Sequence, residues 1–256
     1  MNKDWFKKWF NTGDYLDLYN HRDSADAAKI AKLIENTVKL PKGSNILDVA
    51  CGNGRHSRIF AKEGYNVLGI DLSPYLINEA KKELRKSTDQ IKERLNFEIR
   101  DMRHLRYKKR FDMVINLFSS FGYFEDDKDN LRVIKGISSS LKKGGYFFFD
   151  YLNPVSLRKN LVPFDISIRN HNVILQVRNI KGNSVYKDIA IVKNSKTSRT
   201  PVVSRFNEMI KLYGPEDFKT FFSRFGLKIV RKFGDYQGST FKKSESERMI
   251  IVAVKK

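Results

Sequence analysis

The sequence predicts an α/β fold centred on a mostly parallel, seven-stranded sheet with an antiparallel last strand, accompanied by a small antiparallel β insertion. Short apolar segments alternate with amphipathic helical segments over residues 24–152, a pattern typical of a parallel sheet with helices on both faces. From residue 164 the apolar positions change to a period of two, which indicates antiparallel strands. The link between the last two strands shows no helical periodicity, so we expect these strands to pair in antiparallel fashion.

The elements of the first part of the chain follow from apolar spacing and from helix start and stop residues. Ser24 is a suitable N-cap for the first helix, and Ser73-Pro74 supplies an N-cap and a first-turn proline for a later one. Helices are predicted over residues 24–40 and 55–63, after Ser73-Pro74 and before Gly144-Gly145. Strands are predicted at residues 45–50, 65–71, 95–101, 111–118 and 146–152.

The second part of the chain combines the insertion with the end of the main sheet. Alternating apolar residues between positions 164 and 212, with a turn at Lys181-Gly182-Asn183, indicate three or four antiparallel strands. A helix then begins at Gly214-Pro215, and its apolar face consists of Phe218, Phe221, Phe222 and Phe225. The last two strands are predicted at residues 227–235 and 247–256.

Composition excludes several classes of protein. With 41% apolar side chains in 256 residues, the chain is long enough to bury a substantial core, which excludes disorder as the dominant state. Cys51 is the only cysteine, so an intramolecular disulfide and a zinc site of several cysteines are both excluded. No apolar segment approaches the roughly 20 residues of a membrane helix, and residues 1–10 do not resemble a signal peptide. We therefore expect a soluble, cytoplasmic protein without membrane contact.

The net charge of +20 is distributed unevenly. Residues 1–150 hold 28 basic and 21 acidic side chains, whereas residues 151–256 hold 21 and 8. An excess of this size can attract a polyanion such as nucleic acid, and it can equally reflect solvated lysines that keep the protein soluble. We favour the second interpretation, because the basic residues are scattered along the sequence.

The strongest motif is DVACGNG at residues 48–54, where the first predicted strand gives way to a helix. Glycines at such a turn allow a ligand close to the backbone, and the N-terminus of the following helix presents free N–H groups to an anion. Asp71 ends the second predicted strand, twenty-three residues after Asp48, where a carboxylate can accept both hydroxyls of a ribose. The pattern therefore predicts a ligand that contains a nucleoside.

Two further features follow the next strands: Asp101-Met102 after the third, and residues 117–122 after the fourth. Together with the glycine loop they resemble class I S-adenosylmethionine-dependent methyltransferases over residues 45–152. The resemblance implies a Rossmann-like fold, and S-adenosyl-L-methionine as cofactor with S-adenosyl-L-homocysteine as product. Within this family, the segments at residues 101–103, 110–112 and 117–123 look most like small-molecule N-methyltransferases, including those that act on amino sugars.

The same resemblance implies a role for each residue along the sheet edge. The methionine end of the cofactor would lie near Ala50, Gly52 and Gly54, with Asp48 supporting that charged end. Asp71 would accept hydrogen bonds from the ribose diol. The remaining contacts, all to the adenine, would come from Asp101, Met102, Leu72 and Leu117.

Residues 15–23 (YLDLYNHRD) resemble the N-terminal lid segment of such enzymes, which places Tyr19 and Arg22 near the cofactor carboxylate. Tyr15 and Tyr19 are also spaced as ordinary helix-packing residues. For the acceptor, we predict catalytic or orienting roles for Tyr123, Tyr151 and His21, and we expect no metal. Methyl transfer from a sulfonium depends mainly on alignment, so a general base is optional.

These assignments define a division of the chain, and they leave alternatives open. We expect an N-terminal helical lid at residues 1–40, a methyltransferase domain at residues 41–153 and 214–256, and an insertion at residues 154–213 that covers the active site. The favoured function is methylation of N or O on a small molecule. The alternatives are an RNA or protein methyltransferase that binds its substrate through the basic C-terminal half and Arg106–Arg110, and a noncatalytic binding protein. The oligomeric state is left open.

Overall fold

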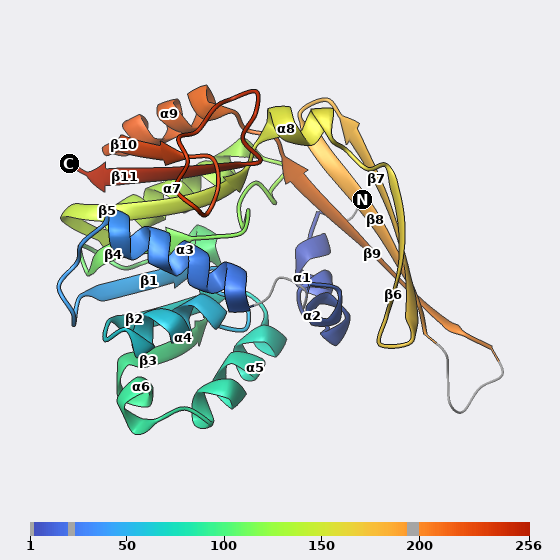
Figure 1. Cartoon of the computed structure of the whole chain (residues 1–256), viewed down its shortest axis with the longest axis horizontal. Helices are drawn as coiled ribbons and strands as arrows, with labels where there is room; N and C mark the ends of the chain where they lie inside the picture. The colour runs from blue at the N-terminus through green and yellow to red at the C-terminus, as the bar shows by residue number, and fades with distance from the viewer. Residues whose placement is uncertain (1–2, 20–23, 194–199) are drawn as a thin grey trace.

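The computed structural model describes residues 3–19, 24–193 and 200–256. A seven-stranded sheet has the order β10-β11-β5-β4-β1-β2-β3, and a separate sheet has the order β6-β7-β8-β9 (Figure 1). The strands of the large sheet are β1 (Asn45–Val49), β2 (Asn66–Asp71), β3 (Leu95–Ile99), β4 (Phe111–Asn116), β5 (Leu141–Leu152), β10 (Leu227–Phe233) and β11 (Arg248–Lys255). Those of the small sheet are β6 (Phe164–Arg169), β7 (Asn172–Lys181), β8 (Ser184–Lys193) and β9 (Val202–Lys211).

The strand directions confirm the predicted fold class. Strands β1 to β5 pair in parallel, whereas β11 lies between β10 and β5 and is antiparallel to both. All four strands of the small sheet are antiparallel to their neighbours. In this arrangement the C-terminal ends of β1 to β4 lie along one edge of the large sheet, where ligands bind in open α/β sheets.

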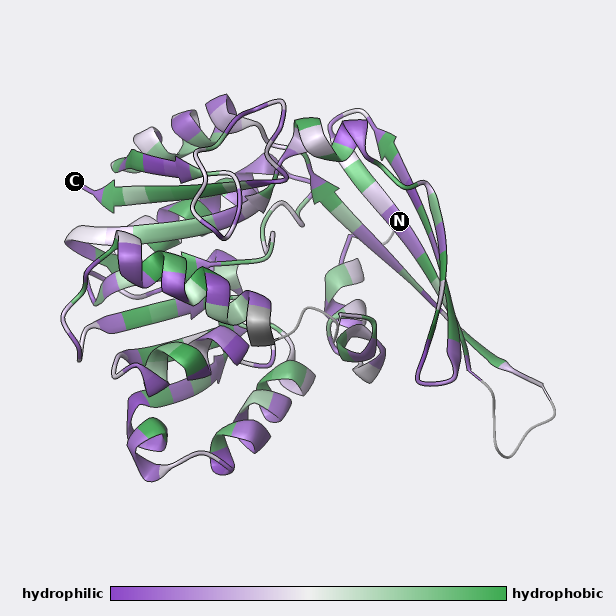
Figure 2. Cartoon of the chain, viewed as in Figure 1, coloured by the Kyte–Doolittle hydropathy of each residue, from purple (hydrophilic) through white to green (hydrophobic). Residues whose placement is uncertain are grey.

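Helices cover both faces of the large sheet, and hydrophobic residues predominate along its inner strands (Figure 2). Leu47 and Val49 of β1 belong to the core layer that also contains residues of α7 (Asp127–Ser140) and α9 (Pro215–Arg224). Ile46 points to the opposite face and belongs to a second core layer, with residues of α3 (Ser24–Thr37), α4 (Arg55–Lys62) and α5 (Pro74–Arg85). The alternation of side chains along a strand thus divides the core into two layers.

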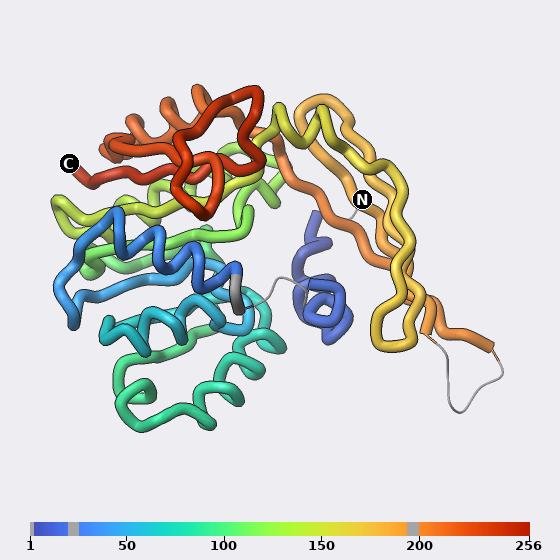
Figure 3. The backbone as a smooth tube through the Cα atoms, viewed as in Figure 1, coloured from blue at the N-terminus to red at the C-terminus, as the bar shows by residue number. Residues whose placement is uncertain are grey.

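The N-terminal helices α1 (Trp5–Trp9) and α2 (Gly13–Tyr19) lie between the two sheets (Figures 1 and 3). Trp9 packs against Phe206 of β9 with ring centroids 4.4 Å apart and the rings tilted by 36°, and Asp14 of α2 forms an ion pair with Lys193 of β8. The small sheet therefore faces the edge of the large sheet across these helices.

Several local predictions were wrong. The helices α6 (Asp89–Arg94) and α8 (Pro154–Lys159) were not predicted, because each is a short polar segment without a long apolar period. Strand β5 begins at Leu141, five residues earlier than predicted, and its glycines 144 and 145 lie within the strand rather than after a helix. Within the described ranges, no helix is long and apolar enough to cross a membrane.

Candidate functional site

In the loop between β1 and α4, every second residue has a left-handed backbone conformation. Ala50, Gly52 and Gly54 have φ angles of 58°, 58° and 73°, and the Cys51 N–H donates to the carbonyl of Ile70 at 2.9 Å. A Cβ on Gly52 would meet no atom within 4 Å, whereas one on Gly54 would lie 2.3 Å from Phe97 Cζ. The two glycines thus serve different needs, since Gly52 keeps space open and Gly54 allows close packing.

Asp71 and Asp101 line a small cavity of about 60 Å³ together with Leu72 and Met102. The two oxygens of Asp71 accept the N–H groups of Gly52 and Ser73, both at 2.9 Å. Burial raises the pKa of Asp71, although these N–H donors act in the opposite direction. The structure therefore brings together the predicted ribose and adenine residues, except for Leu117.

Asp101 is not a free carboxylate. Burial favours a higher pKa, but Arg103 outweighs it through a 2.6 Å ion pair and a backbone hydrogen bond, so the pKa of Asp101 is lowered. This pairing keeps Asp101 ionised and turned toward the loop that follows β3.

Asp48 lies beneath the glycine loop with only 2% of its surface exposed. Its Oδ2 accepts the hydroxyl of Ser57 at 2.6 Å, and it forms no ion pair with any described residue. Burial raises the pKa of Asp48 to about 7, opposed in part by the Ser57 hydrogen bond. A buried carboxylate without a positive partner favours a cationic group in the space that it borders.

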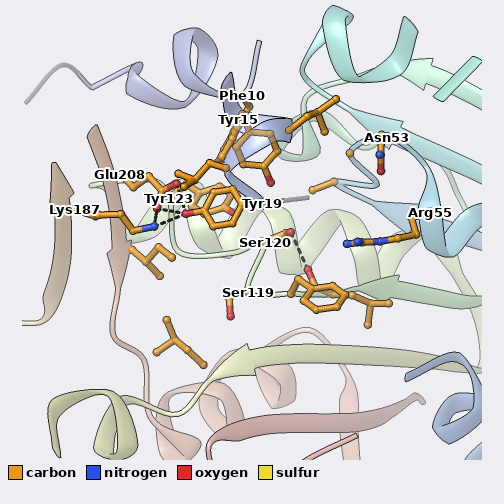
Figure 4. Close-up of a pocket in the computed structure, with 18 of the residues that line it drawn as sticks. Phe10, Tyr15, Tyr19, Asn53, Arg55, Ser119, Ser120, Tyr123, Lys187 and Glu208 are labelled. Carbon is orange, nitrogen blue, oxygen red and sulfur yellow. Dashed lines mark hydrogen bonds and ion pairs between the residues drawn. The ribbon is translucent and has the colours of Figure 1, made fainter. Parts of the chain in front are cut away.

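A larger cavity of about 710 Å³ adjoins the small one, with which it shares Ala50, Gly52, Ser120 and Tyr123 among its lining residues. It extends from the glycine loop to the inner face of the small sheet (Figure 4). Asn53 and Arg55 lie on one side of this cavity, and Lys187 and Glu208 lie on the other. Its volume falls in the range of small-molecule sites.

Glu208 of β9 joins the N-terminal helices to the small sheet. Its carboxylate accepts hydrogen bonds from Trp9 Nε1 and from the Tyr19 hydroxyl, both at 2.7 Å, and it forms a 2.9 Å ion pair with Lys187. Burial by itself favours a raised pKa, but Lys187 and these hydrogen bonds outweigh it, so the pKa of Glu208 is lowered. Tyr19, predicted to contact the cofactor, lines the larger cavity with its hydroxyl held by Glu208.

Other predicted residues are placed differently. Tyr151 is fully buried in the aromatic core and does not line either cavity; its hydroxyl donates to the carbonyl of Lys211, and burial strongly raises its pKa. The structure thus removes Tyr151 from the catalytic candidates, because it can reach no ligand. Leu117 lines only the larger cavity, and Gly54 lines neither. His21 and Arg22 lie outside the described residues.

The sequence did not predict an ion pair between β5 and β11 at the larger cavity. Asp150, which is fully buried in β5, binds Arg248 of β11 at 2.8 Å, and Arg248 lines the larger cavity. An acidic residue inside the apolar strand YFFFDYL was the available signal, since a buried charge requires a partner. Nothing local to Arg248 identifies it as that partner.

Comparisons with known proteins agree with this geometry. Residues 46–145 match the model of a methyltransferase domain. A dTDP-3-amino-3,4,6-trideoxy-alpha-D-glucopyranose N,N-dimethyltransferase from Streptomyces venezuelae is 25% identical over 80% of this chain and 84% of its own length. A ubiquinone biosynthesis O-methyltransferase from Coxiella burnetii is 34% identical over 48% of this chain, which spans about half (49%) of that relative.

Solved structures show the same fold. An S-adenosylmethionine-dependent methyltransferase from Clostridium acetobutylicum superposes with a TM-score of 0.79 at 21% identity, covering 94% of this chain and 96% of its own. A sugar N-methyltransferase from Streptoalloteichus superposes with a TM-score of 0.73 at 19% identity, covering 96% and 93%. The predicted family resemblance is confirmed.

Proposed function

We propose that this chain is an S-adenosylmethionine-dependent methyltransferase and that it transfers the methyl group to an amino nitrogen of a small molecule. The observation that carries the proposal is the larger cavity, which is bounded by the glycine loop on one side and by the small sheet on the other. Nitrogen is favoured over oxygen because the N,N-dimethyltransferase relative matches over 84% of its length, and the O-methyltransferase over only 49%.

The residues around the small cavity fit the adenosine of the cofactor. Each oxygen of Asp71 accepts one N–H group and retains a second acceptor position, which matches the two hydroxyls of a ribose. Leu72 and Met102 supply apolar contact for the adenine, beside the carboxylate of Asp101. We propose that Ala50, Gly52 and Gly54 shape the methionine end, with Leu117 and Tyr19 next to it.

When bound, the cofactor supplies a methyl group on an activated sulfonium. The protein then has to align the acceptor and exclude water, and such alignment can lower a barrier by about 7 to 11 kcal/mol. Tyr123 lines both cavities and is therefore suited to orient the acceptor where the two meet. We retain it as the catalytic or orienting candidate among the described residues.

The domain division is part of the proposal. Residues 41–153 and 214–256 would bind the cofactor, and residues 154–213 would bind the acceptor. Of the predicted lid at residues 1–40, α1 and α2 would form the lid, because α3 packs in the core of the large sheet. The hydrogen bonds of Glu208 with Trp9 and Tyr19 support this division, since they join the lid to the insertion at the larger cavity.

An RNA substrate is less well supported. Lys109 and Arg110 directly precede β4 and donate their N–H groups to the carbonyls of Ser139 and Ser140, so they lie at the N-terminal end of β4, about 20 Å from its C-terminal end for a strand of six residues. The charged residues that line the larger cavity are of both signs, whereas a phosphate-binding groove is dominated by cations. They are Arg55, Arg169, Arg178, Lys187, Arg248, Asp17, Asp48, Asp165 and Glu208.

The test is methyl incorporation from radiolabelled S-adenosylmethionine into separated fractions of small metabolites, RNA and protein. We expect label in the small-metabolite fraction, on compounds that carry a primary or secondary amine. Label confined to the RNA or protein fraction would contradict the proposal, and calorimetry with S-adenosylhomocysteine would show separately whether the cofactor site binds.

A further inference from the structure

The loop after β4 has a rare backbone conformation. Phe118 and Ser119 have φ angles of 56° and 62°, and both line the larger cavity. Residues other than glycine seldom adopt the left-handed region, and two in succession persist only where their surroundings hold them. Such a segment in a cavity wall points to a function for the atoms that it presents.

Asp150 supplies the support. Its Oδ2 accepts the N–H of Phe118 at 2.8 Å, and its backbone carbonyl accepts the N–H of Ser119 at 3.0 Å. Arg248 donates to the Oδ1 of Asp150 through Nε at 2.9 Å and Nη2 at 2.8 Å. The carboxylate is thus held on one side by a two-point ion pair and holds the loop on the other.

The same guanidinium orients the side chain of Ser119. Arg248 Nη2 donates to Ser119 Oγ at 3.0 Å, so the hydroxyl accepts on that side. Its own proton must then be donated elsewhere, and none of the described residues accepts it. Because Ser119 and Arg248 both line the larger cavity, a ligand there can receive this proton.

We propose that Ser119 donates a hydrogen bond to an oxygen of the methyl acceptor, and that Asp150 is a positioning residue that aims it through Arg248. The inference rests on the proposed function and deepens it. A hydroxyl donor backed by a guanidinium favours an oxygen that carries negative charge density and disfavours an ammonium group. The acceptor class is therefore a small amine that bears a hydroxyl or another oxygen function beside the methylated nitrogen.

The experiment uses Ser119→Ala and Asp150→Asn in the full chain. The probes are S-adenosylhomocysteine for the cofactor site, and two acceptors: an amino sugar with a hydroxyl beside the amine, and its counterpart without that hydroxyl. We expect both variants to bind S-adenosylhomocysteine with affinities within about threefold of the wild type. For the hydroxyl-bearing sugar, kcat/KM should fall about tenfold or more, and for the deoxy sugar it should change by less than about twofold, since a lost donor affects only a ligand that used it.

Two controls match the substitutions. Ser138→Ala removes a buried hydroxyl that donates to Phe225 O, and Asp112→Asn neutralises an acid paired with Lys142 at the opposite edge of the sheet. Neither should distinguish the two sugars. Equal losses on both sugars in the Ser119 variant, or no loss on either, would overturn the role of Ser119.

Amide hydrogen exchange tests Asp150 without any acceptor. With S-adenosylhomocysteine bound, Asp150→Asn should speed exchange at residues 118 and 119 by about tenfold or more, and Ser119→Ala should not. Unchanged exchange in the Asp150 variant would overturn its positioning role. A wild type that binds S-adenosylhomocysteine but methylates neither sugar would contradict the acceptor class, and absence of that binding would instead contradict the proposed function.

Discussion

Replacement of Asp71 by alanine is the most direct test of the cofactor site. Both oxygens of Asp71 already accept a backbone N–H, from Gly52 and from Ser73, and each has one acceptor position left. If a ribose diol occupies those positions, the variant loses two hydrogen bonds to a charged group. Hydrogen bonds of this kind contribute about 1.5 to 3 kcal/mol each.

The expected loss is smaller than the sum of two such bonds, because water can solvate the ribose in the space that alanine leaves. A loss of about 2 to 4 kcal/mol corresponds to a dissociation constant about 30- to 1000-fold higher, at about 1.4 kcal/mol per factor of ten. The variant should also be less stable by about 1 to 3 kcal/mol, because the N–H groups of Gly52 and Ser73 lose their acceptor. The dissociation constant and the free energy of unfolding of Asp71→Asn should both lie between those of Asp71→Ala and the wild type.

Isothermal titration with S-adenosylhomocysteine measures the affinity, and a thermal melt shows that the variant is folded at the titration temperature. Asp112→Ala is the matched control, since Asp112 also accepts a backbone N–H, from Asn45, pairs with Lys142 and lines neither cavity. Its affinity should equal that of the wild type. An Asp71→Ala variant that binds as tightly as the wild type would refute the ribose assignment and the alignment of strand ends on which it depends.

Three further predictions concern the loop, its buried acid and the lid. Gly52→Ala should weaken binding of S-adenosylhomocysteine at least tenfold but destabilise the fold by only about 1 to 2 kcal/mol, because its Cβ enters open space. Gly54→Ala should destabilise the fold by about 3 kcal/mol or more, because its Cβ would clash with Phe97. Protonated Asp48 stabilises the fold by about 4 kcal/mol, and this contribution is complete below about pH 4 and is lost as the pH rises to about 7. The difference between the unfolding free energies of the wild type and of Asp48→Asn should therefore fall between about pH 4 and about pH 7. Glu208→Gln should lower the free energy of unfolding by about 1 to 3 kcal/mol, because it replaces the buried, charged acceptor of Trp9, Tyr19 and Lys187 by a neutral amide.

Each of these has a distinct readout. Titration and urea unfolding together separate the two glycine variants, and equal effects on both quantities would contradict their different roles. For Asp48, unfolding curves at several pH values suffice, and a constant or rising difference would contradict a raised pKa. For Glu208, tryptophan fluorescence reports on the lid because both tryptophans lie in α1; an unchanged urea midpoint would show that the charge of Glu208 contributes nothing to stability.

The sequence by itself determined the elements that depend on local chemistry. Strand and helix periods, the DVACGNG turn and the acids at the ends of β2 and β3 are readable because each is a property of a short segment. Parallel strands with right-handed connections place their C-terminal ends at a common edge, so Asp48, Asp71 and Asp101 were expected to lie near one another. The short helices α6 and α8 escaped prediction because six residues carry too little periodicity.

Only the tertiary structure decided which distant side chains meet. Asp150 and Arg248 are 98 residues apart, and Trp9 and Glu208 are 199 apart; their contacts depend on strand order, on register and on how the small sheet packs over the edge. The same packing buried Tyr151 and left Tyr123 at the junction of the two cavities. A local pattern fixes which face a side chain lies on, but its partner is set by the three-dimensional arrangement of segments that the chain brings together from far apart.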